Sequence, residues 1–382
     1  MDFALTEEQK MLQKMTRDFA REEIEPHIRE WEENGGIPRE IFDKMAKLGM
    51  LGATAPPEYG GSGMDNVSYH VMMEEIARVC SSLRTAMSVH ISLCQTTIMK
   101  FGSEEQKRKY LAPLAKGEKL GAWALTEPDA GSDAANQRTT ARPEADSYIL
   151  NGTKMFISNG SVADIVIIFA RLPGTKRHEG LCPFVVEKGM GGFYPGTVES
   201  NTKLGLRASP TAELILEDCA VPKENLVGRE GQGWEIAMDI LNHGRLSVAA
   251  GAVGVARACL EESIEFAKAR EAFGRPIAKF QLIREMIAEM AMGIEAGRLL
   301  VYKAASLVDR GEDPTLAASE AKLFTAKMVM KAADYAVQIH GGYGYSSEYP
   351  VERYFRDAKI HGIYEGTNQI QTLVIAREVL GE

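Results

Sequence analysis

Residues 246–267 read LSVAAGAVGVARACLEESIEFA. Their apolar residues recur every three or four positions, which places them on one stripe along a helix. The small residues in this stripe allow a second helix to pack closely against it. Residues 283–301 and 321–339 repeat the pattern, and long helices with such faces predict a bundle over residues 226–382. Asp313 and Pro314 have the pattern of an N-cap followed by proline at the first position of the third helix.

Residues 121–225 carry a β pattern instead. The short apolar runs 121–125, 165–170, 181–187 and 212–216 are separated by Gly and Pro, as in an all-β domain. In the run YILNGTKMF at residues 148–156, Asn-Gly stands between two strand-like segments. This dipeptide predicts a hairpin, because both residues tolerate positive φ.

The first third of the chain, residues 1–120, reads as helix. Thr6 and Gln9 have the spacing of a capping box, so we expect a helix to begin near Glu7. Leu12 and Phe19 continue its apolar face. The predicted order is therefore helical, then β, then a helical bundle.

Composition narrows the class of protein. The 382 residues are 45% apolar and 25% charged, as in globular proteins rather than disordered or fibrous chains. The net charge of −9 argues against nucleic acid as the main partner, and no apolar run is long enough for a transmembrane helix. The five cysteines lack a CxxC pair, which favours free thiols. The N-terminus does not resemble a signal peptide, so we expect a cytoplasmic protein, or a mitochondrial matrix protein if this is a processed chain.

Four segments carry possible chemistry: residues 123–133, 155–160, 269–276, and 338–345 together with 363–370. Each is also consistent with a plainer interpretation. The first is compatible with a simple turn, and Phe156 in the second with a buried packing residue. The basic residues of the third suit the end of a helix dipole, and Glu365 in the fourth suits a solvated loop.

Taken together and in this order, the four segments closely resemble the acyl-CoA dehydrogenase family. The runs TEPDAGSD at 126–133 and IYEGT at 363–367 carry most of the resemblance, which extends from Phe3 to Ile370. It implies an α+β protein with an N-terminal helical domain over 1–120, a β-barrel-like middle domain over 121–225 and a C-terminal four-helix bundle over 226–382. It also implies non-covalent FAD, a homotetramer, an acyl-CoA substrate and an electron-transfer flavoprotein as partner.

The resemblance assigns roles residue by residue. Glu365 is expected to be the catalytic base that takes the α-proton while the β-hydrogen leaves as hydride to the flavin. Some branches place the base just before the position of Arg245, but here that residue is Gly244, which has no side chain. Phe156 stands where many relatives have Trp. The expected FAD contacts are Leu125, Thr126, Gly131, Ser132, Phe156, Ile157, Ser158, Arg270, Phe273, Gln281, Gln338, Ile339, Gly341, Gly342, Thr367 and Gln369, partly across a subunit interface.

The acyl group is predicted from the run SSLRTAMSV at residues 81–89. Glutaryl-CoA dehydrogenases carry a similar run, in which the arginine binds the distal carboxylate. Arg84 therefore favours a dicarboxylic acyl-CoA, with glutaryl-CoA first and a substituted succinyl-CoA second. The alternatives are a short-chain substrate without a carboxylate, or an Arg84 that pairs with a protein acid or points to solvent. The expected substrate contacts are Arg84, Thr85, Ser88, Ser132, Asn242, Arg245, Tyr364 and Gly366.

Two rival functions remain at this stage. The same fold supports acyl-CoA oxidases and flavin-dependent monooxygenases, which use oxygen, and a non-catalytic helical scaffold belongs to another class altogether. An intact Glu365 and the FAD motifs weigh against the scaffold.

Overall fold

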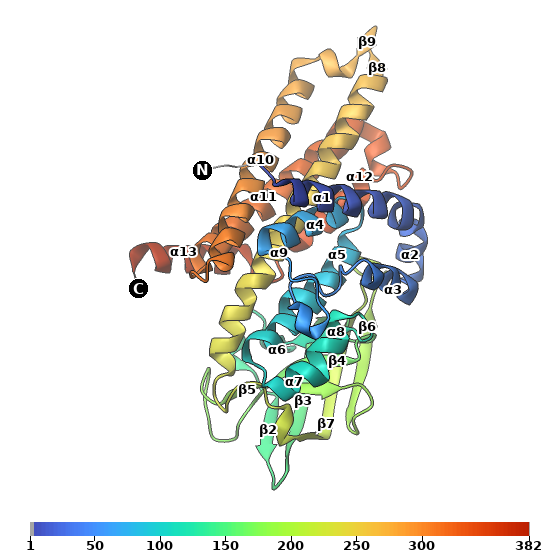
Figure 1. Ribbon diagram of the computed structural model, residues 1–382. Helices are drawn as coiled ribbons and strands as arrows, with labels where there is room; N and C mark the ends of the chain where they lie inside the picture. Colours follow the sequence, from blue (N-terminus) through green and yellow to red (C-terminus); the bar gives the residue numbers. More distant parts are fainter. Residues whose placement is uncertain (1–3, 382) are drawn as a thin grey trace.

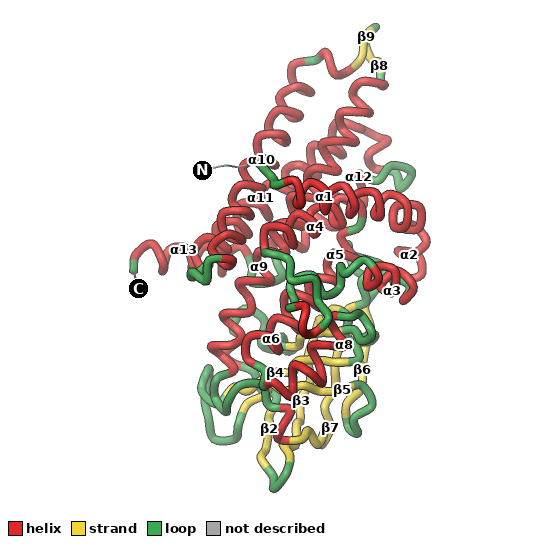
Figure 2. Tube along the Cα trace, viewed as in Figure 1, coloured by secondary structure: helices red, strands yellow, loops and turns green. Residues whose placement is uncertain are grey.

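A computed structural model describes residues 4–381, so Phe3, the first residue of the N-terminal motif, lies outside the described part. Helices from both ends of the sequence fill the upper part of the molecule in Figure 1, and the strands of the middle segment lie together at the bottom, in yellow in Figure 2. Further N-terminal helices pack beside these strands. The α+β class with helical, β and helical segments is confirmed.

The C-terminal segment is built on three long helices. Helix α9 contains the whole apolar stripe of residues 246–267, and its contacts with α4 and α11 bury most of that stripe. At Gly254 the helices meet so closely that a Cβ would collide with the carbonyl oxygen of Glu74. The helices are α9 (Gly233–Ala269), α10 (Gln281–Asp309), α11 (Thr315–His340), α12 (Val351–Ala358) and α13 (Asn368–Leu380). The short strands β8 (Glu271–Ala272) and β9 (Arg275–Pro276) connect α9 and α10 at the top of Figure 1.

The start of α11 differs by one residue from the prediction. The helix begins at Thr315, so Pro314 precedes it rather than occupying its first position. Asp313 Oδ1 accepts hydrogen bonds from the backbone N–H of Thr315 at 2.9 Å and from its hydroxyl at 2.6 Å. The Asp-Pro pair therefore still marks the helix start, through a turn placed one residue earlier.

The N-terminal segment consists of α-helices that are joined by 3-10 turns, π-helical turns and loops. Helix α1 begins at Glu7, and both hydrogen bonds of the predicted capping box between Thr6 and Gln9 are present. The helices are α1 (Glu7–Phe19), α2 (Ile28–Asn34), α3 (Arg39–Lys47), α4 (Asn66–Val79), α5 (Ser81–Ser88), α6 (Thr96–Phe101), α7 (Glu104–Gln106) and α8 (Ala112–Ala115). A π-helical stretch, η4 (Val89–Gln95), joins α5 to α6.

The middle segment forms one seven-stranded sheet. Its hydrogen-bonded order is β1-β4-β2-β3-β7-β6, and β5 branches from β4. The strands β2 and β6 had no counterpart in the sequence prediction, because their burial patterns show few buried residues. The strands are β1 (Gly121–Ala124), β2 (Thr140–Pro143), β3 (Ser147–Ser158), β4 (Ile165–Arg171), β5 (Leu181–Glu187), β6 (Phe193–Glu199) and β7 (Thr211–Pro222).

The predicted hairpin at Asn151-Gly152 is wrong. Both residues lie inside the continuous strand β3, where the register with β7 shifts between Leu150 and Gly152. Gly152 has a φ of +149°, and a Cβ there would lie 2.6 Å from Thr139 Oγ1. The Asn151 side chain exchanges two hydrogen bonds with Asp218 of β7, at 3.0 and 2.8 Å. A β-bulge, anchored by a residue distant in sequence, therefore replaces the turn.

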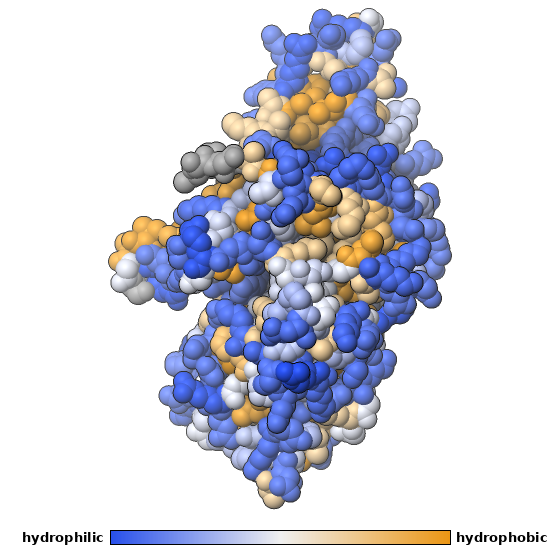
Figure 3. Space-filling model, viewed as in Figure 1, coloured by the Kyte–Doolittle hydropathy of each residue, from blue (hydrophilic) through white to orange (hydrophobic). Residues whose placement is uncertain are grey.

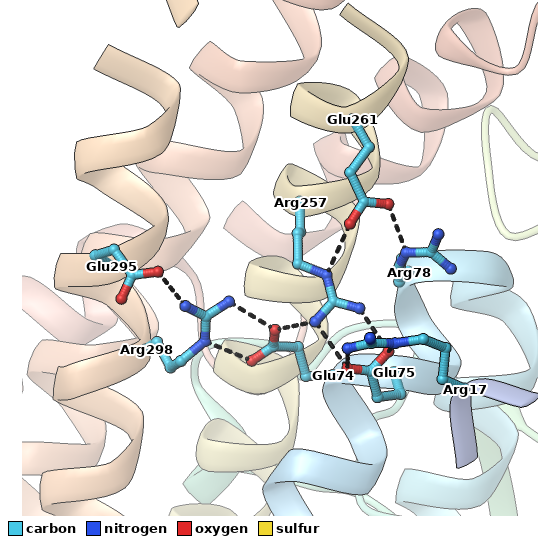
Figure 4. Close-up of polar contacts among 8 residues, drawn as sticks. All are labelled: Arg17, Glu74, Glu75, Arg78, Arg257, Glu261, Glu295 and Arg298. Atoms are coloured by element: carbon cyan, nitrogen blue, oxygen red, sulfur yellow. Dashed lines mark hydrogen bonds and ion pairs between the residues drawn. The ribbon is translucent and has the colours of Figure 1, made fainter. Parts of the chain in front are cut away.

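An ionic cluster ties four helices together (Figure 4). Glu74 and Glu75 of α4 are buried, and Arg257 of α9 donates to both, at 2.7 Å to Glu74 and 2.5 Å to Glu75. Arg298 of α10 donates to Glu74 at 2.9 Å, and Arg17 of α1 donates to Glu75 at 2.9 Å. Burial raises the pKa of Glu75, but the hydrogen bonds from Arg257 and Arg17 outweigh it and leave the pKa below its ordinary value. Each buried carboxylate in this cluster is thus matched by guanidinium groups.

The five cysteines are all buried and unpaired. Within residues 4–381, no helix is long and apolar enough to cross a membrane.

We expect Arg257→Ala to lower the free energy of unfolding by about 3–5 kcal/mol, because it leaves two buried carboxylates undercompensated. Urea denaturation measures the effect. Lys303→Met is the control: it removes an exposed ion pair between Lys303 and Glu320, 3.3 Å apart, and should cost less than about 1 kcal/mol. Equal losses in the two variants would show that the cluster contributes no more than a surface pair.

Candidate active site

Glu365 stands in a short segment between the 3-10 turn η10 (Lys359–Gly362) and helix α13. Its φ is +53°, in the left-handed region that non-glycine residues rarely adopt, and Gly366 follows at +85°. Such a conformation costs about 1–3 kcal/mol and persists only where the surroundings enforce it. Thr367 then caps α13, and its hydroxyl accepts a hydrogen bond from the backbone N–H of Ile370 at 3.3 Å. The chain therefore holds Glu365 in one fixed, strained orientation.

The Glu365 carboxylate lies against the backbone of α9. A Cβ at Gly244 would stand 2.5 Å from Glu365 Oε2 and 2.8 Å from its Cδ, so only glycine leaves room for the acid. Leu93 of η4 closes the same space, because its Cδ2 would lie 3.0 Å from that Cβ. Oε2 is buried and has no hydrogen-bond partner among the described residues. A buried oxygen of this kind retains its full capacity to accept a proton.

The charge state of Glu365 follows from this burial. Desolvation raises its pKa from 4.5 to about 7, although the positive charges of Arg245, Lys322 and Arg84 act in the opposite direction. A base with its pKa near neutral pH combines a sizeable deprotonated fraction with a strong pull on the proton. The geometry and the electrostatics therefore both suit proton abstraction.

Arg84 of α5 is fully buried beside this acid. Its Nη2 donates to the hydroxyl of Tyr364 and, at 2.9 Å, to Thr85 Oγ1, while its Nε has no partner. A Cβ at Gly251 of α9 would stand 2.6 Å from that Nε, so a second glycine makes room for the guanidinium. Within residues 4–381, no carboxylate forms an ion pair with Arg84. The structure thus excludes the alternatives in which Arg84 pairs with a protein acid or points to solvent.

A second buried arginine faces Glu365 from α9. Arg245 Nη1 donates to Asn242 Oδ1 at 2.8 Å, and its Nε is buried without a partner. Burial lowers the pKa of Arg245, and the negative charge of Glu365 raises it. Asn242 in turn donates to the hydroxyl of Thr315 at 3.0 Å. The structure therefore brings Arg84 and Arg245 close to Glu365, with Tyr364 bonded to the first and Asn242 to the second. Their assignment as substrate contacts stays a prediction.

The expected flavin contacts of the middle segment come from two adjoining stretches, the loop after β1 and the end of β3. The backbone N–H of Met155 donates to Thr126 O at 2.9 Å, which joins the loop after β1 to the end of β3. Phe156 has a φ of +58° and is 63% exposed, at a register shift between Lys154 and Ile157. The remaining expected contacts differ in exposure: Leu125 and Ile157 are buried, Ser158 is half-buried, and Gly131 and Ser132 are exposed.

Two residues that support this loop were not predicted. Lys154 is fully buried, and its Nζ donates to Glu127 at 2.8 Å and to Leu125 O at 3.2 Å. Glu127 also accepts hydrogen bonds from the backbone N–H groups of Arg138 and Thr139, at 2.5 and 3.0 Å. A lysine in a β-strand pattern reads as an exposed residue, so the sequence contains no signal for this buried pair.

Asn159 links the end of β3 to α5, the helix that carries Arg84. It is buried with a φ of +63°, and its Nδ2 donates to Ala86 O of α5 at 2.9 Å and to Gly121 O of β1 at 3.1 Å. Ala86 lies two residues after Arg84. One amide thus joins the strand end beside Phe156 to the helix of Arg84.

The other expected flavin contacts lie elsewhere. Arg270 stacks on the ring of Tyr343 at 5.6 Å, so the end of α9 adjoins the segment after α11. Phe273 is 95% exposed at the tip between α9 and α10, at the opposite end of the molecule from the sheet (Figure 1). Gln281 is exposed near this tip, and Gln338, Gly341 and Gly342 are exposed at the end of α11, where Ile339 is buried. Thr367 and Gln369 lie at the start of α13. One chain therefore does not assemble the whole set.

A carboxylate with a raised pKa, a free oxygen and cations nearby has the features of a general-base site that accepts an anionic ligand. Comparison with known proteins is more specific. Models of the N-terminal, middle and C-terminal domains of acyl-CoA dehydrogenases match residues 6–118, 122–219 and 231–380. The chain belongs to the acyl-CoA dehydrogenase family, whose enzymes are FAD-dependent oxidoreductases.

Its relatives cover the full chain. The short-chain-specific acyl-CoA dehydrogenase of Clostridium acetobutylicum is 48% identical over 99% of this chain and 100% of its own length. A chain in the solved structure of the electron-transferring flavoprotein of Acidaminococcus fermentans is 48% identical, with a TM-score of 0.98 and full coverage of both chains. A glutaryl-CoA dehydrogenase in complex with glutaryl-CoA is 43% identical, with a TM-score of 0.96 over 100% of this chain and 97% of the other.

The raised pKa of Glu365 makes stability depend on pH. Because the pKa is 4.5 in the unfolded chain and about 7 in the fold, the stability that the bound proton contributes is complete below pH 4.5 and is lost as the pH rises through 7. Glu365→Gln removes this titration. Between pH 5 and pH 8, we expect the variant to gain up to about 3 kcal/mol relative to the unchanged protein, measured by urea unfolding. The same pH dependence in both proteins would contradict the raised pKa.

Proposed function

We propose that this protein dehydrogenates a short-chain acyl-CoA to the 2,3-enoyl-CoA. The observation that carries the proposal is the free, buried Oε2 of Glu365, held against Gly244 beside the unpaired guanidinium of Arg245. Glu365 takes the α-proton of the thioester. When bound, FAD would supply the redox chemistry that amino-acid side chains lack, as the acceptor for the β-hydrogen, which would leave as hydride.

The thioester oxygen gains negative charge as the proton leaves, and a hydrogen-bond donor must meet it. Among the described residues, none accepts a hydrogen bond from the backbone N–H of Glu365. This free donor belongs to the same residue as the base, so one strained backbone position supplies both the proton acceptor and a donor to the oxygen. We assign Asn242 and Arg245 to the CoA end of the substrate, where a buried cation suits an anionic ligand.

The residues around Phe156 fit a flavin. An exposed aromatic ring, the hydroxyls of Thr126 and Ser158, and an open space at Gly131 provide a flat face with hydrogen-bonding groups. Arg270 and the glycines Gly341 and Gly342 suit a pyrophosphate, because an added Cβ at either glycine would meet no atom. These residues would hold FAD with its ring at the sheet and its phosphates at a helix tip.

Because these two groups of residues lie apart in one chain, we expect a second copy to supply one of them to each flavin. Large apolar side chains are exposed on α10 and α13, among them Leu282, Met292, Leu373 and Leu380. Orange patches over α13 and over the upper parts of α9 and α10 mark apolar surface in Figure 3. Such surfaces are typical of subunit contacts, and they support the expected homotetramer.

Two substrates deserve a direct comparison. The name of the Clostridium acetobutylicum relative favours an unsubstituted short-chain acyl group such as butyryl, and this is the better supported of the two. Arg84 favours a carboxylate at the far end of the chain, as in glutaryl-CoA, because a buried guanidinium without an acid is costly unless a ligand supplies one. The similarity to a glutaryl-CoA dehydrogenase structure points the same way.

For the electron acceptor we propose an electron-transfer flavoprotein, supported by the full-length likeness to a chain in such a structure. Turnover with this partner or an artificial acceptor, compared with turnover under oxygen alone, separates a dehydrogenase from an oxidase or monooxygenase.

Glu365→Gln tests the base. The amide keeps the shape of the side chain but cannot take a proton, so we expect the variant to retain the yellow colour of bound FAD and to lose bleaching by acyl-CoA by at least about 10³-fold. Anaerobic titration with butyryl-CoA and glutaryl-CoA measures this. Unchanged bleaching would refute the assignment of Glu365, and a purified protein without FAD would revive the scaffold.

Arg84→Met tests the acyl group, because methionine fills the space without the charge. If the substrate carries a carboxylate, kcat/KM should fall by about 100-fold or more on glutaryl-CoA and far less on butyryl-CoA. Gly251→Ala provides a second variant, since its methyl group displaces the guanidinium without removing it. Equal effects of Arg84→Met on both substrates would leave the unsubstituted short chain as the substrate.

A further inference from the structure

Two buried side chains outside the family motifs converge on the segment that carries the base. Lys322 of α11 is fully buried, and its Nζ donates to the carbonyl oxygen of Gly366 at 2.7 Å. Gln371 of α13 is also fully buried, and its Nε2 donates to Glu365 O at 3.0 Å and to Gly366 O at 3.1 Å. The two carbonyls that flank this strained turn therefore have partners from two different helices.

These contacts depend on the sequence of the turn. A Cβ at Gly366 would stand 2.6 Å from Gln371 Nε2, so only glycine lets the amide reach both carbonyls. The left-handed φ of +53° at Glu365 turns its carbonyl and that of Gly366 toward the donors. The backbone strain at the base is thus balanced by buried hydrogen bonds that an ordinary helical or extended turn would not form.

The charge on Lys322 acts differently from its hydrogen bond. Within residues 4–381, Lys322 forms no ion pair with a carboxylate. Its ammonium group donates hydrogen bonds to the carbonyl oxygen of Gly366 and to the side-chain amide oxygen of Asn368. The positive charge nevertheless favours the ionised form of Glu365. Lys322 therefore stabilises the carboxylate without occupying Oε2, the atom that must accept the substrate proton.

We propose that Lys322 and Gln371 are positioning residues for the reaction, and that they act through the backbone of Glu365 and Gly366. Gln371 sets the direction of the carboxylate. Lys322 also orients the carboxylate, and it adds a nearby positive charge that favours the ionised form of Glu365. The proposal rests on the assignment of Glu365 as the base.

The charge states of the groups around Glu365 decide which titration appears in the pH profile of kcat. Arg84 faces it from α5, Arg245 from α9 and Lys322 from α11, and each lowers the pKa of Glu365. Tyr364 is uncharged near neutral pH, because burial raises the pKa of its hydroxyl above the ordinary value. His361 stays neutral, because burial lowers its pKa well below the ordinary value, and Arg377 of α13 pairs with Glu378 at 2.7 Å. Burial lowers the pKa of Lys322 to about 8, so it is charged at pH 7.

Three variants of the FAD-loaded enzyme separate the two roles. In Lys322→Met, the acidic limb of the kcat profile should move to higher pH by about one unit, and kcat at pH 7 should fall by about 10-fold or more with little change in KM. Lys322→Gln keeps a hydrogen-bond donor without a charge. The acidic limb of its kcat profile should therefore also move to higher pH, while its maximal kcat should stay above that of Lys322→Met. Gln371→Leu changes no charge, so kcat should fall by about 10- to 100-fold with the limb in place.

Lys303→Met, a lysine-to-methionine change at an exposed ion pair on α10, is the matched control and should leave the profile unchanged. Wild-type limbs in both Lys322 variants and an unchanged kcat in Gln371→Leu, in an enzyme that turns over acyl-CoA, would overturn the proposal.

A double-mutant cycle tests the charge without any turnover. Lys322→Met is combined with Glu365→Gln, and the thermal midpoint is measured at pH 7.5 and at pH 5. The higher pH lies between the pKa of Glu365, about 7, and that of Lys322, about 8, so both groups are mostly charged there. At pH 7.5 Lys322→Met should destabilise the protein more when Glu365 is present than when Gln replaces it, and the difference should shrink at pH 5, where the acid is protonated. Additive effects at pH 7.5 would overturn the charge role of Lys322. A wild-type enzyme that reacts with no acyl-CoA would instead overturn the proposed function, while this cycle still reports on the pair.

Discussion

The structure depends on one constraint: a carboxylate must be kept dry and unpaired, yet remain able to ionise. Burial alone would favour the neutral form of Glu365, and a direct ion pair would occupy the oxygen to which we assign the proton transfer. The fold meets both demands by placing cations near the acid but bonding them to other groups. Arg245 donates to Asn242, Lys322 to Gly366 and Arg84 to Tyr364.

The same chain handles charge in the opposite way elsewhere. In the ionic cluster of α1, α4, α9 and α10, Glu74 and Glu75 meet guanidinium groups directly, and Arg257 spans both. That cluster stabilises the helical frame because each buried charge is compensated. Around Glu365, Arg84 Nε and Arg245 Nε stay without partners. The stability of the helical frame offsets the free energy that these buried, unpaired donors cost. Helix α9 takes part in both, with Arg257 in the cluster and Gly244 beneath the acid.

Local signals in the sequence proved reliable where neighbours in sequence are also neighbours in space. The capping box at Thr6 and Gln9 lies within one turn, and the stripe of residues 246–267 lies on one helix. The Asn151-Gly152 pair misled because its partner, Asp218, stands on another strand 67 residues away. For the same reason Lys154 and Lys322 read as ordinary surface residues, although both are fully buried.

The sequence by itself determined the family and the order of its segments, since these depend on motifs and on helical periodicity. It also singled out the two residues on which the proposals rest, Glu365 as the proposed base and Arg84 as the proposed acyl contact. Only the tertiary structure decided which charges are compensated, because burial and hydrogen bonding depend on helices that meet from distant parts of the chain. The unpaired Nε of Arg84, the left-handed turn at Glu365 and the convergence of Lys322 and Gln371 on it all follow from that packing.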